Sequence, residues 1–332
     1  MRPPLRPPVR HRRAAATAAA AAAVAATAAL ALGGCSAAST AGEAGSPIVT
    51  SFYPIQFATQ QVVGNAAEVT VLTRPGAEPH DLELAPQDIG GMTRARLVVY
   101  ADGFQPAVDE AVGLVDGAKV LDVAAAAKLV PASADEPGHE GESPGQHEEH
   151  AKHDEHGHGA DDPHFWLDPS RYAAVAQAIS ARLSADDPAK ASTYARNTAV
   201  FVEKLSQLDD ELRVGLRQCR TKQLVTSHGA FAYLAARYGF HQQGITGMSP
   251  EAEPSAAALK AVSDLVSSAG VTTIYQETLV EPHFAQTVAQ STGAKVATLD
   301  PIEGITSATR GSDYFEVMRS NLATLREGQG CS

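Results

Sequence analysis

Short apolar, β-branched runs alternate along this chain with segments whose apolar residues recur three and four positions apart. The runs expected to form strands are 47–52, 68–72, 96–101, 119–123, 222–227, 243–247, 271–276 and 295–299. The helical spacing between them is clearest in 55–63 and 254–269. Strands that alternate with helices favour parallel sheets with helices on both faces. The pattern therefore predicts an α/β fold, and the order of elements is similar in the two halves of the chain.

One long amphipathic segment separates these two halves. It follows the helix-start signal Asp187-Pro188, and its apolar face continues for about eight turns through Tyr194, Phe201, Leu205, Leu208, Leu212 and Leu216. Some 30 helical residues would reach ~45 Å, which is longer than one lobe needs. We expect a rigid linker helix over 187–218 that joins an N-terminal α/β lobe, 47–186, to a C-terminal α/β lobe, 219–332. The alternative is that it is simply the longest helix of a single domain.

The first 35 residues have the features of an export signal. Five arginines precede an uncharged, Ala-rich run that ends in Leu32-Gly33-Gly34-Cys35. A cysteine directly after Leu-Gly-Gly resembles the lipobox of bacterial lipoproteins, which implies that Cys35 carries the lipid and anchors the mature chain to the outside of the cell membrane. A plain transmembrane helix is the alternative. Residues 36–46 are small and polar, and we expect a flexible tether there.

Charge and cysteine content narrow the range of partners. The formal net charge is −12, and ten acidic residues lie between Asp135 and Asp162. Since no basic patch exists, nucleic acid is not an expected partner. In a compartment where disulfides persist, Cys219 and Cys331 are predicted to pair; two free buried thiols are the alternative.

Candidate ligands stand at the ends of strands or at junctions between elements, where open parallel sheets bind their ligands. They are His80, His164, His228, Glu277 and Asp300. Each has an ordinary structural explanation on its own, because a single histidine in a turn is more often not a ligand. Their coincidence in both halves of an exported protein indicates a metal site.

Histidines are concentrated in the acidic segment 131–162. Six of the twelve in the chain lie there: His139, His147, His150, His153, His156 and His158. Such tracts are typical of weak, interchangeable metal sites. We interpret the segment as an accessory zinc collector or sensor, with a dispensable spacer as the alternative.

Several motifs together resemble the metal-specific solute-binding lipoproteins of bacterial zinc and manganese ABC importers. These are Pro79-His80-Asp81-Leu82-Glu83, Asp162-Pro163-His164-Phe165-Trp166-Leu167-Asp168-Pro169, Thr226-Ser227-His228-Gly229-Ala230-Phe231, Ser249-Pro250-Glu251-Ala252-Glu253-Pro254-Ser255 and Leu299-Asp300-Pro301. The resemblance runs from Pro47 to the C-terminus. It implies two (β/α) lobes joined by a long helix, with the metal in the cleft between them.

By position, the resemblance implies that His80, His164, His228 and Asp300 are the metal ligands. Some zinc members use water or another acidic residue in place of the aspartate, and Glu277 is an alternative ligand or a hydrogen-bonding neighbour of one. Three imidazoles and one carboxylate suit Zn²⁺, whereas manganese prefers more oxygen ligands.

The expected function is capture of Zn²⁺ outside the cytoplasm by a lipid-anchored monomer, with delivery to an ABC importer permease and its ATPase. A manganese carrier of the same type is the alternative. An extracytoplasmic zinc hydrolase is a further one, although the chain has no H-E-x-x-H pair. A surface adhesin belongs to a third class, but no adhesion motif is recognisable.

Overall fold

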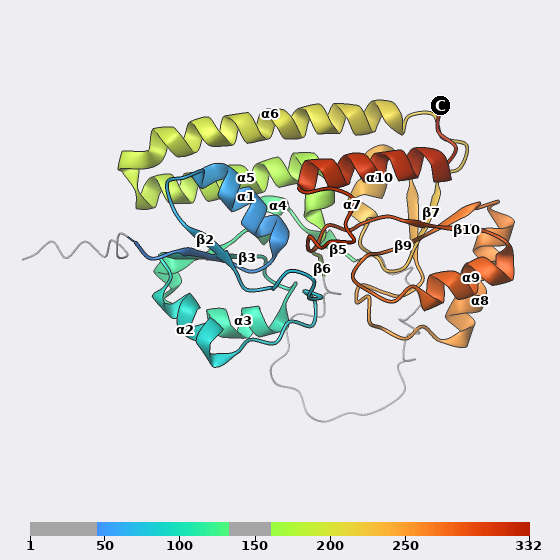
Figure 1. Cartoon of the computed structure of the whole chain (residues 1–332), viewed down its shortest axis with the longest axis horizontal. Coiled ribbons are helices and arrows are strands. Elements are labelled where there is room, and N and C mark those ends of the chain that lie inside the picture. Colours follow the sequence, from blue (N-terminus) through green and yellow to red (C-terminus); the bar gives the residue numbers. More distant parts are fainter. Residues whose placement is uncertain (1–44, 133–160) are drawn as a thin grey trace, which may run out of the picture. The chain divides into compact units, whose positions relative to one another are not determined.

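The computed structural model describes residues 45–132 and 161–332. Within these ranges the chain forms two α/β lobes, each built on a parallel four-stranded sheet (Figure 1). Cys35 and the six histidines from His139 to His158 lie outside the described residues. None of the described helices combines the length and apolar character needed to cross a membrane.

The first lobe has its helices on both faces of one sheet. Its strands are β1 (Ile48–Thr50), β2 (Val69–Val71), β3 (Leu97–Tyr100) and β4 (Val120–Asp122), all parallel and in the order β2-β1-β3-β4. Alternate strand residues such as Ile48 and Val49 belong to two different apolar clusters. The first cluster includes residues of α1 (Tyr53–Val63), and the second includes residues of α2 (Pro86–Arg94) and α3 (Pro106–Val112). A short α4 (Ala124–Ala127) follows β4.

The second lobe repeats this topology. Its strands are β7 (Gln223–Thr226), β8 (His241–Gly244), β9 (Thr273–Gln276) and β10 (Lys295–Thr298), parallel in the order β8-β7-β9-β10. Its helices are α7 (Ala232–Tyr238), α8 (Ala256–Ser268), α9 (His283–Thr292) and α10 (Tyr314–Gly328). Counted within each lobe, both sheets have the strand order 2-1-3-4, so the α/β fold and the similar order of the two halves are confirmed.

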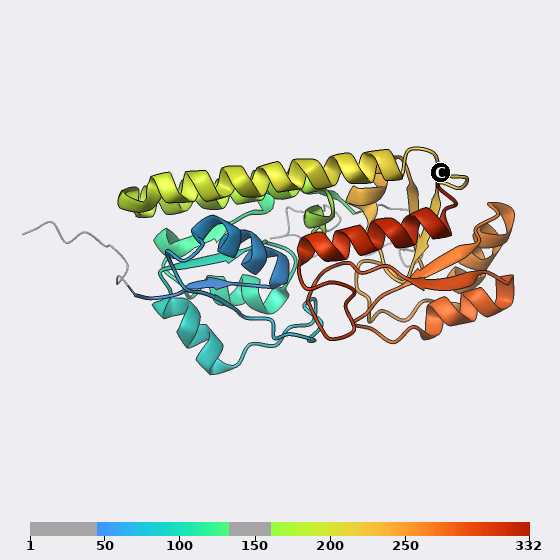
Figure 2. The same ribbon diagram turned by 45° about the horizontal axis from the view of Figure 1, so that its top comes forward.

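Two long helices connect the lobes. The chain leaves the first sheet through an antiparallel pair, β5 (Val130–Pro131) and β6 (Asp161–Asp162), and enters α5 (Pro169–Asp186). The next helix, α6 (Ala191–Gly215), spans 25 residues, or about 37 Å. It packs against α1 of the first lobe and α10 of the second (Figures 1 and 2).

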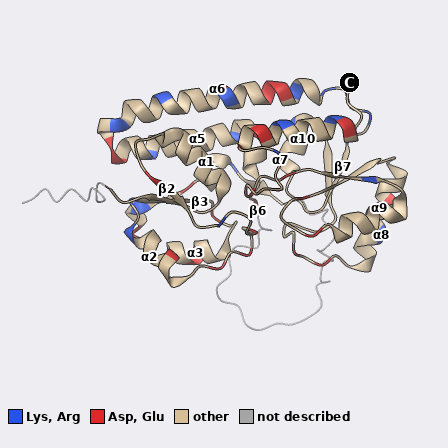
Figure 3. Cartoon of the chain, in the orientation of Figure 1, with Lys and Arg blue, Asp and Glu red and all other residues tan. Residues whose placement is uncertain are grey.

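The observed α6 is shorter than the predicted linker helix 187–218. A 3₁₀ turn at Pro188–Lys190 precedes it, and the chain turns away after Leu216. The pairing of Cys219 with Cys331 is confirmed, with an S–S distance of 2.01 Å. Lys and Arg are scattered along α6 and α10 and are interspersed with Asp and Glu, so these helices present no continuous positive stripe (Figure 3).

Candidate metal centre

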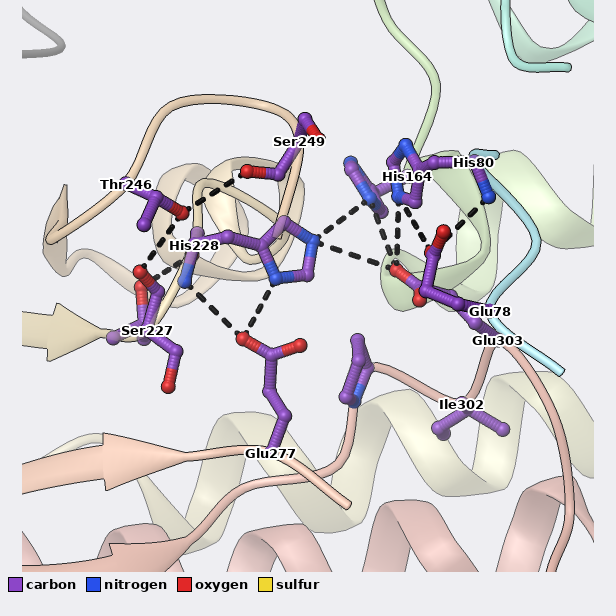
Figure 4. A network of polar contacts seen from close by, with 12 residues as sticks. Glu78, His80, His164, Ser227, His228, Thr246, Ser249, Glu277, Ile302 and Glu303 are labelled. Carbon is purple, nitrogen blue, oxygen red and sulfur yellow. Dashed lines mark hydrogen bonds and ion pairs between the residues drawn. The ribbon is translucent and has the colours of Figure 1, made fainter. Parts of the chain in front are cut away.

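Three histidines from distant parts of the sequence meet with one glutamate between the two sheets. His80 lies in the loop that follows β2, and His228 comes two residues after β7. His164 precedes the 3₁₀ turn η2 (Phe165–Leu167), and Glu303 lies in the loop that follows β10. One potential ligand atom from each of these four residues lies within 4.8 Å of all the others (Figure 4).

The spacing of these atoms fits a small tetrahedral ion. Oε1 of Glu303 is 3.4 Å from Nε2 of His80, 3.2 Å from that of His164 and 3.4 Å from that of His228. The Nε2 atoms of His164 and His228 are 3.4 Å apart. A tetrahedron with metal–ligand bonds of about 2.05 Å has edges of about 3.3 Å. Four of the six edges of a zinc site are therefore already present.

Two carboxylates orient two of the imidazoles in the same way. Oδ1 of Asp162 accepts hydrogen bonds from the backbone N of His164, at 2.9 Å, and from its Nδ1, at 2.8 Å. Oε1 of Glu277 does the same for His228, at 3.1 and 2.7 Å. Since the proton is held on Nδ1, both Nε2 atoms keep a lone pair for a metal.

His80 is held differently. Its backbone N donates to Oε1 of Glu78, and its ring lies edge-on to Phe104 with the centroids 4.6 Å apart. Gln105, which is buried, donates from Nε2 to the carbonyl of Pro79 and to the hydroxyl of Thr73. These contacts hold the start of the loop and the residue just before His80. Its side chain is 11% exposed, while those of His164, His228 and Glu303 are at most 1% exposed.

Burial and charge act against each other in this cluster. Burial alone disfavours the imidazolium, but the charge and hydrogen bonds of Glu277 and Glu303 outweigh it and hold the pKa of His228 well above its usual value. The pKa of His164 is also raised, because Asp162 and Glu303 offset its burial. Burial would raise the pKa of Glu303, yet its hydrogen bonds to the three imidazoles keep that pKa well below the usual range. Without a metal, protons therefore favour the same ring positions that a metal would use.

Among the residues expected as ligands, the structure brings together His80, His164 and His228 but not Asp300. The carboxylate of Asp300 accepts from the backbone N of Ile302, at 2.8 Å, and from the hydroxyl of Thr278, at 3.0 Å, and so it stabilises its own loop. Its burial raises its pKa to about 6. Glu277 hydrogen-bonds His228 and lies outside the group of four.

The strand-end rule does not point to Glu303, because this residue lies three positions beyond Asp300, which the rule selects. It belongs to the same loop as Asp300, and carboxylates throughout that loop were the available signal. The sequence rules also do not identify Asp162 as the partner of His164, although the two residues stand in one motif.

Comparisons with known proteins find relatives that are named for zinc binding and zinc uptake. The chain is 37% identical over 283 residues to the zinc-binding protein AdcA of Streptococcus pyogenes serotype M3, covering 84% of this chain and 55% of that protein. The zinc-binding lipoprotein AdcA of Streptococcus pneumoniae strain R6 is 36% identical over 286 residues, with the same coverage. The chain thus spans about half the length of these streptococcal relatives. The high-affinity zinc uptake system protein ZnuA of Bacillus subtilis is 34% identical over 314 residues. This alignment covers 90% of this chain and 93% of that protein.

Solved structures show the same fold. The Zn(II)-bound ZnuA-like domain of Streptococcus pneumoniae AdcA superposes with a TM-score of 0.68 at 33% identity, covering 86% of this chain and 99% of that one. A mutant of the laminin-binding adhesin Lmb of Streptococcus agalactiae superposes with a TM-score of 0.72 at 31% identity, covering 86% of this chain and 100% of that one. The family model described as zinc-uptake complex component A, periplasmic, matches residues 48–328. The chain belongs to this zinc-uptake component A family.

Proposed function

We propose that this protein captures one Zn²⁺ between its lobes and delivers it to an ABC-type membrane importer. The observation that carries the proposal is the convergence of three imidazole nitrogens and one carboxylate oxygen at the spacing of a tetrahedral zinc site. Manganese prefers more oxygen donors, so this donor set favours zinc over it. The zinc-binding names of the relatives support the same choice.

The donor set fits a carrier better than a hydrolase. A catalytic zinc keeps one position open for water, whereas His80, His164, His228 and Glu303 would supply four protein ligands. Three of these side chains are almost fully buried, which leaves little room for a substrate beside the ion. The family is a component of an uptake complex, and it is not an enzyme family.

Ligands from both lobes link metal binding to lobe position. His80 belongs to the first lobe, and His228 and Glu303 belong to the second. A bound ion therefore favours the arrangement in which these loops meet, and the importer permease, coupled to its ATPase, would recognise that loaded form. Because α6 packs on both lobes, we expect a small motion between the loaded and empty forms rather than wide hinge closure. A large decrease in the radius of gyration on zinc binding, measured by small-angle scattering, would contradict this.

The ligand set is tested by calorimetry on four variants. His80→Ala and His228→Ala should each abolish the tight zinc site. Glu303→Gln should weaken zinc binding more than Asp300→Asn, because only Glu303 reaches the three Nε2 atoms. The reverse order would restore Asp300 as the fourth ligand, and unchanged tight binding in both histidine variants would refute the site.

Anchoring through Cys35 is a separate part of the proposal. The Leu-Gly-Gly-Cys sequence supports it, as does the lipoprotein name of the Streptococcus pneumoniae relative. Mass spectrometry of the protein extracted from membranes should find a lipid-modified Cys35 as the first residue, and Cys35→Ser should release the protein into the medium. A mature chain that starts elsewhere would contradict the anchor.

The accessory histidines remain a prediction from the sequence. If His139, His147, His150, His153, His156 and His158 form weak sites, deletion of 138–159 should remove weakly bound zinc and leave one tight equivalent. Loss of the tight site on this deletion would show that the segment belongs to the main centre.

A further inference from the structure

The loop 299–303, which carries Glu303, has a backbone that its own sequence does not favour. All five residues are buried. Ile302 has a φ of +62°, in the left-handed region that a β-branched residue rarely adopts. Such a conformation persists only where the surrounding structure holds it. The position of Glu303 therefore depends on contacts made elsewhere in the loop.

Part of this support comes from the loops that follow β9 and β10. Asp300 closes a turn by accepting the backbone N of Ile302, and Thr278, just after β9, donates to its other carboxylate oxygen. These bonds fix the start of the loop, but they do not fix the loop relative to the histidines of the first lobe.

Asn321 on α10 supplies a second support. Its Oδ1 accepts from the backbone N of Asp300 at 3.0 Å, and its Nδ2 donates to the carbonyl of the same residue at 2.7 Å. The side-chain amide thus pairs with both polar groups of one residue, as a neighbouring strand would. Asn321 is 2% exposed, so water cannot replace this pairing.

Trp166 supplies the third support, and it comes from the segment that carries His164. Its Nε1 donates to the carbonyl of Pro301 at 2.7 Å, and the hydroxyl of Tyr314 donates to the backbone carbonyl of Trp166 at 2.7 Å. Its ring centroid lies 5.3 Å from that of His164 and 5.7 Å from that of Phe104, the ring that packs on His80. One fully buried side chain therefore contacts His164, the support of His80 and the loop of Glu303.

We propose that Trp166 and Asn321 are positioning residues for metal capture: neither lies in the ligand group, but together they hold the strained loop so that Glu303 reaches the three imidazoles. Trp166 in addition sets the distance between this loop and His164, and so it couples the ligands of the two lobes. The inference rests on the proposed function, since it takes Glu303 to be a zinc ligand.

Two substitutions test the proposal, with zinc affinity measured by competition against a chromophoric chelator. Trp166→Phe keeps an aromatic ring but removes the donor to Pro301, and Asn321→Leu keeps a similar size without polar groups. Each should weaken zinc binding by about tenfold or more, in the range seen when supports of metal ligands are removed. In a Glu303→Ala background the same substitutions should change the affinity by less than about twofold, because the loop then has no ligand to position.

The outcomes separate the possible failures. If Glu303→Ala alone leaves zinc affinity unchanged, the proposed ligand set falls. If Glu303→Ala weakens binding but Trp166→Phe and Asn321→Leu do not, or if they cost the same in both backgrounds, the positioning role is overturned while the ligand set stands.

Tyr172→Phe is the matched control for Trp166→Phe. The Tyr172 hydroxyl is buried and donates to the carbonyl of Pro54 at 2.6 Å, outside the ligand loops. The substitution should lower thermal stability without changing zinc affinity.

Trp166 is the only tryptophan in the chain, so zinc titration of the unmodified protein, followed by tryptophan fluorescence, adds a test that needs no variant. Its emission should change as zinc saturates, and an unchanged spectrum would contradict the coupling to His164.

Discussion

Replacement of Glu277 by glutamine tests how much the orientation of one imidazole contributes to zinc affinity. Oε1 of Glu277 accepts both the backbone N and the Nδ1 of His228, and both side chains are at most 2% exposed. Glutamine preserves the shape and can offer one oxygen, but it removes the negative charge. Hydrogen bonds to a charged acceptor are roughly twice as strong as neutral ones.

The expected loss is about 10- to 100-fold in zinc affinity, the range for residues that orient a metal-bound histidine. This corresponds to about 1.4–2.7 kcal/mol. The loss should depend on pH. Glu277 helps to raise the pKa of His228, so the unmodified protein must release a proton from His228 to bind zinc at neutral pH. In the variant this pKa is raised less, and a smaller fraction of the protein carries that proton. The affinity ratio between the two proteins should therefore be smallest near pH 6 and should grow as the pH rises.

Chelator competition at pH 6, 7 and 8 measures this ratio. Glu253→Gln makes the same chemical change at an exposed site of the same lobe and should leave affinity unchanged at each pH. Equal affinities of Glu277→Gln and the unmodified protein at pH 8 would refute the orienting role. A ratio that shrank with rising pH would refute the proton argument.

Three further predictions concern stability and the support of His80. The raised pKa values of His164 and His228 stabilise the metal-free protein fully below about pH 6.5, and this contribution is lost as the pH rises through the raised values. The melting temperature of the metal-free protein should therefore fall over this range, while the increase caused by zinc should grow. A metal-free melting temperature that rose with pH would contradict this direction. Reduction of the disulfide, which closes a loop with a sequence separation of 112, should lower the free energy of unfolding by about 4–5 kcal/mol in the chain-entropy model and leave one tight zinc site, as denaturant titration and calorimetry can show. Gln105→Leu should leave the Pro79 carbonyl without its donor, destabilise the protein by about 1–3 kcal/mol and weaken zinc binding, whereas an unchanged affinity would show that the His80 loop is held without it.

The sequence predicted the fold well because the signals for a doubly covered parallel sheet are local. Strands buried on both faces need near-continuous apolar runs, and β3 provides one. Three of the four grouped residues also followed from local signals, since His80, His164 and His228 stand at strand ends or element junctions. The limits of α6 were harder to predict, because amphipathic spacing continues through Leu216, where the helix already ends.

Glu303 could not be predicted in the same way, because its position depends on tertiary contacts. Asp300 comes two residues after β10 and would point to the site if the chain continued smoothly. Instead, the left-handed backbone at Ile302 turns the chain and brings Glu303 inward. No local propensity favours that conformation for isoleucine. It is held by partners such as Trp166 and Asn321, which are far away in the sequence.

The repeated topology of the lobes makes the unequal distribution of ligands informative. From the last residue of the equivalent strands β1 and β7, the chain reads Thr-Ser-Phe in the first lobe and Thr-Ser-His in the second, so Phe52 stands where His228 stands. Phe52 packs on Phe104 and Trp166, which makes this wall of the site apolar. The end of β1 thus contributes an apolar wall to the site and no ligand, and the first lobe supplies His80 and His164 from other segments. His80 is also the most exposed of the four residues and is carried by a loop rather than by a strand end. Of the four, it is therefore the one whose bond to zinc should open first when the lobes separate, because Trp166 links His164 to the loop that carries Glu303.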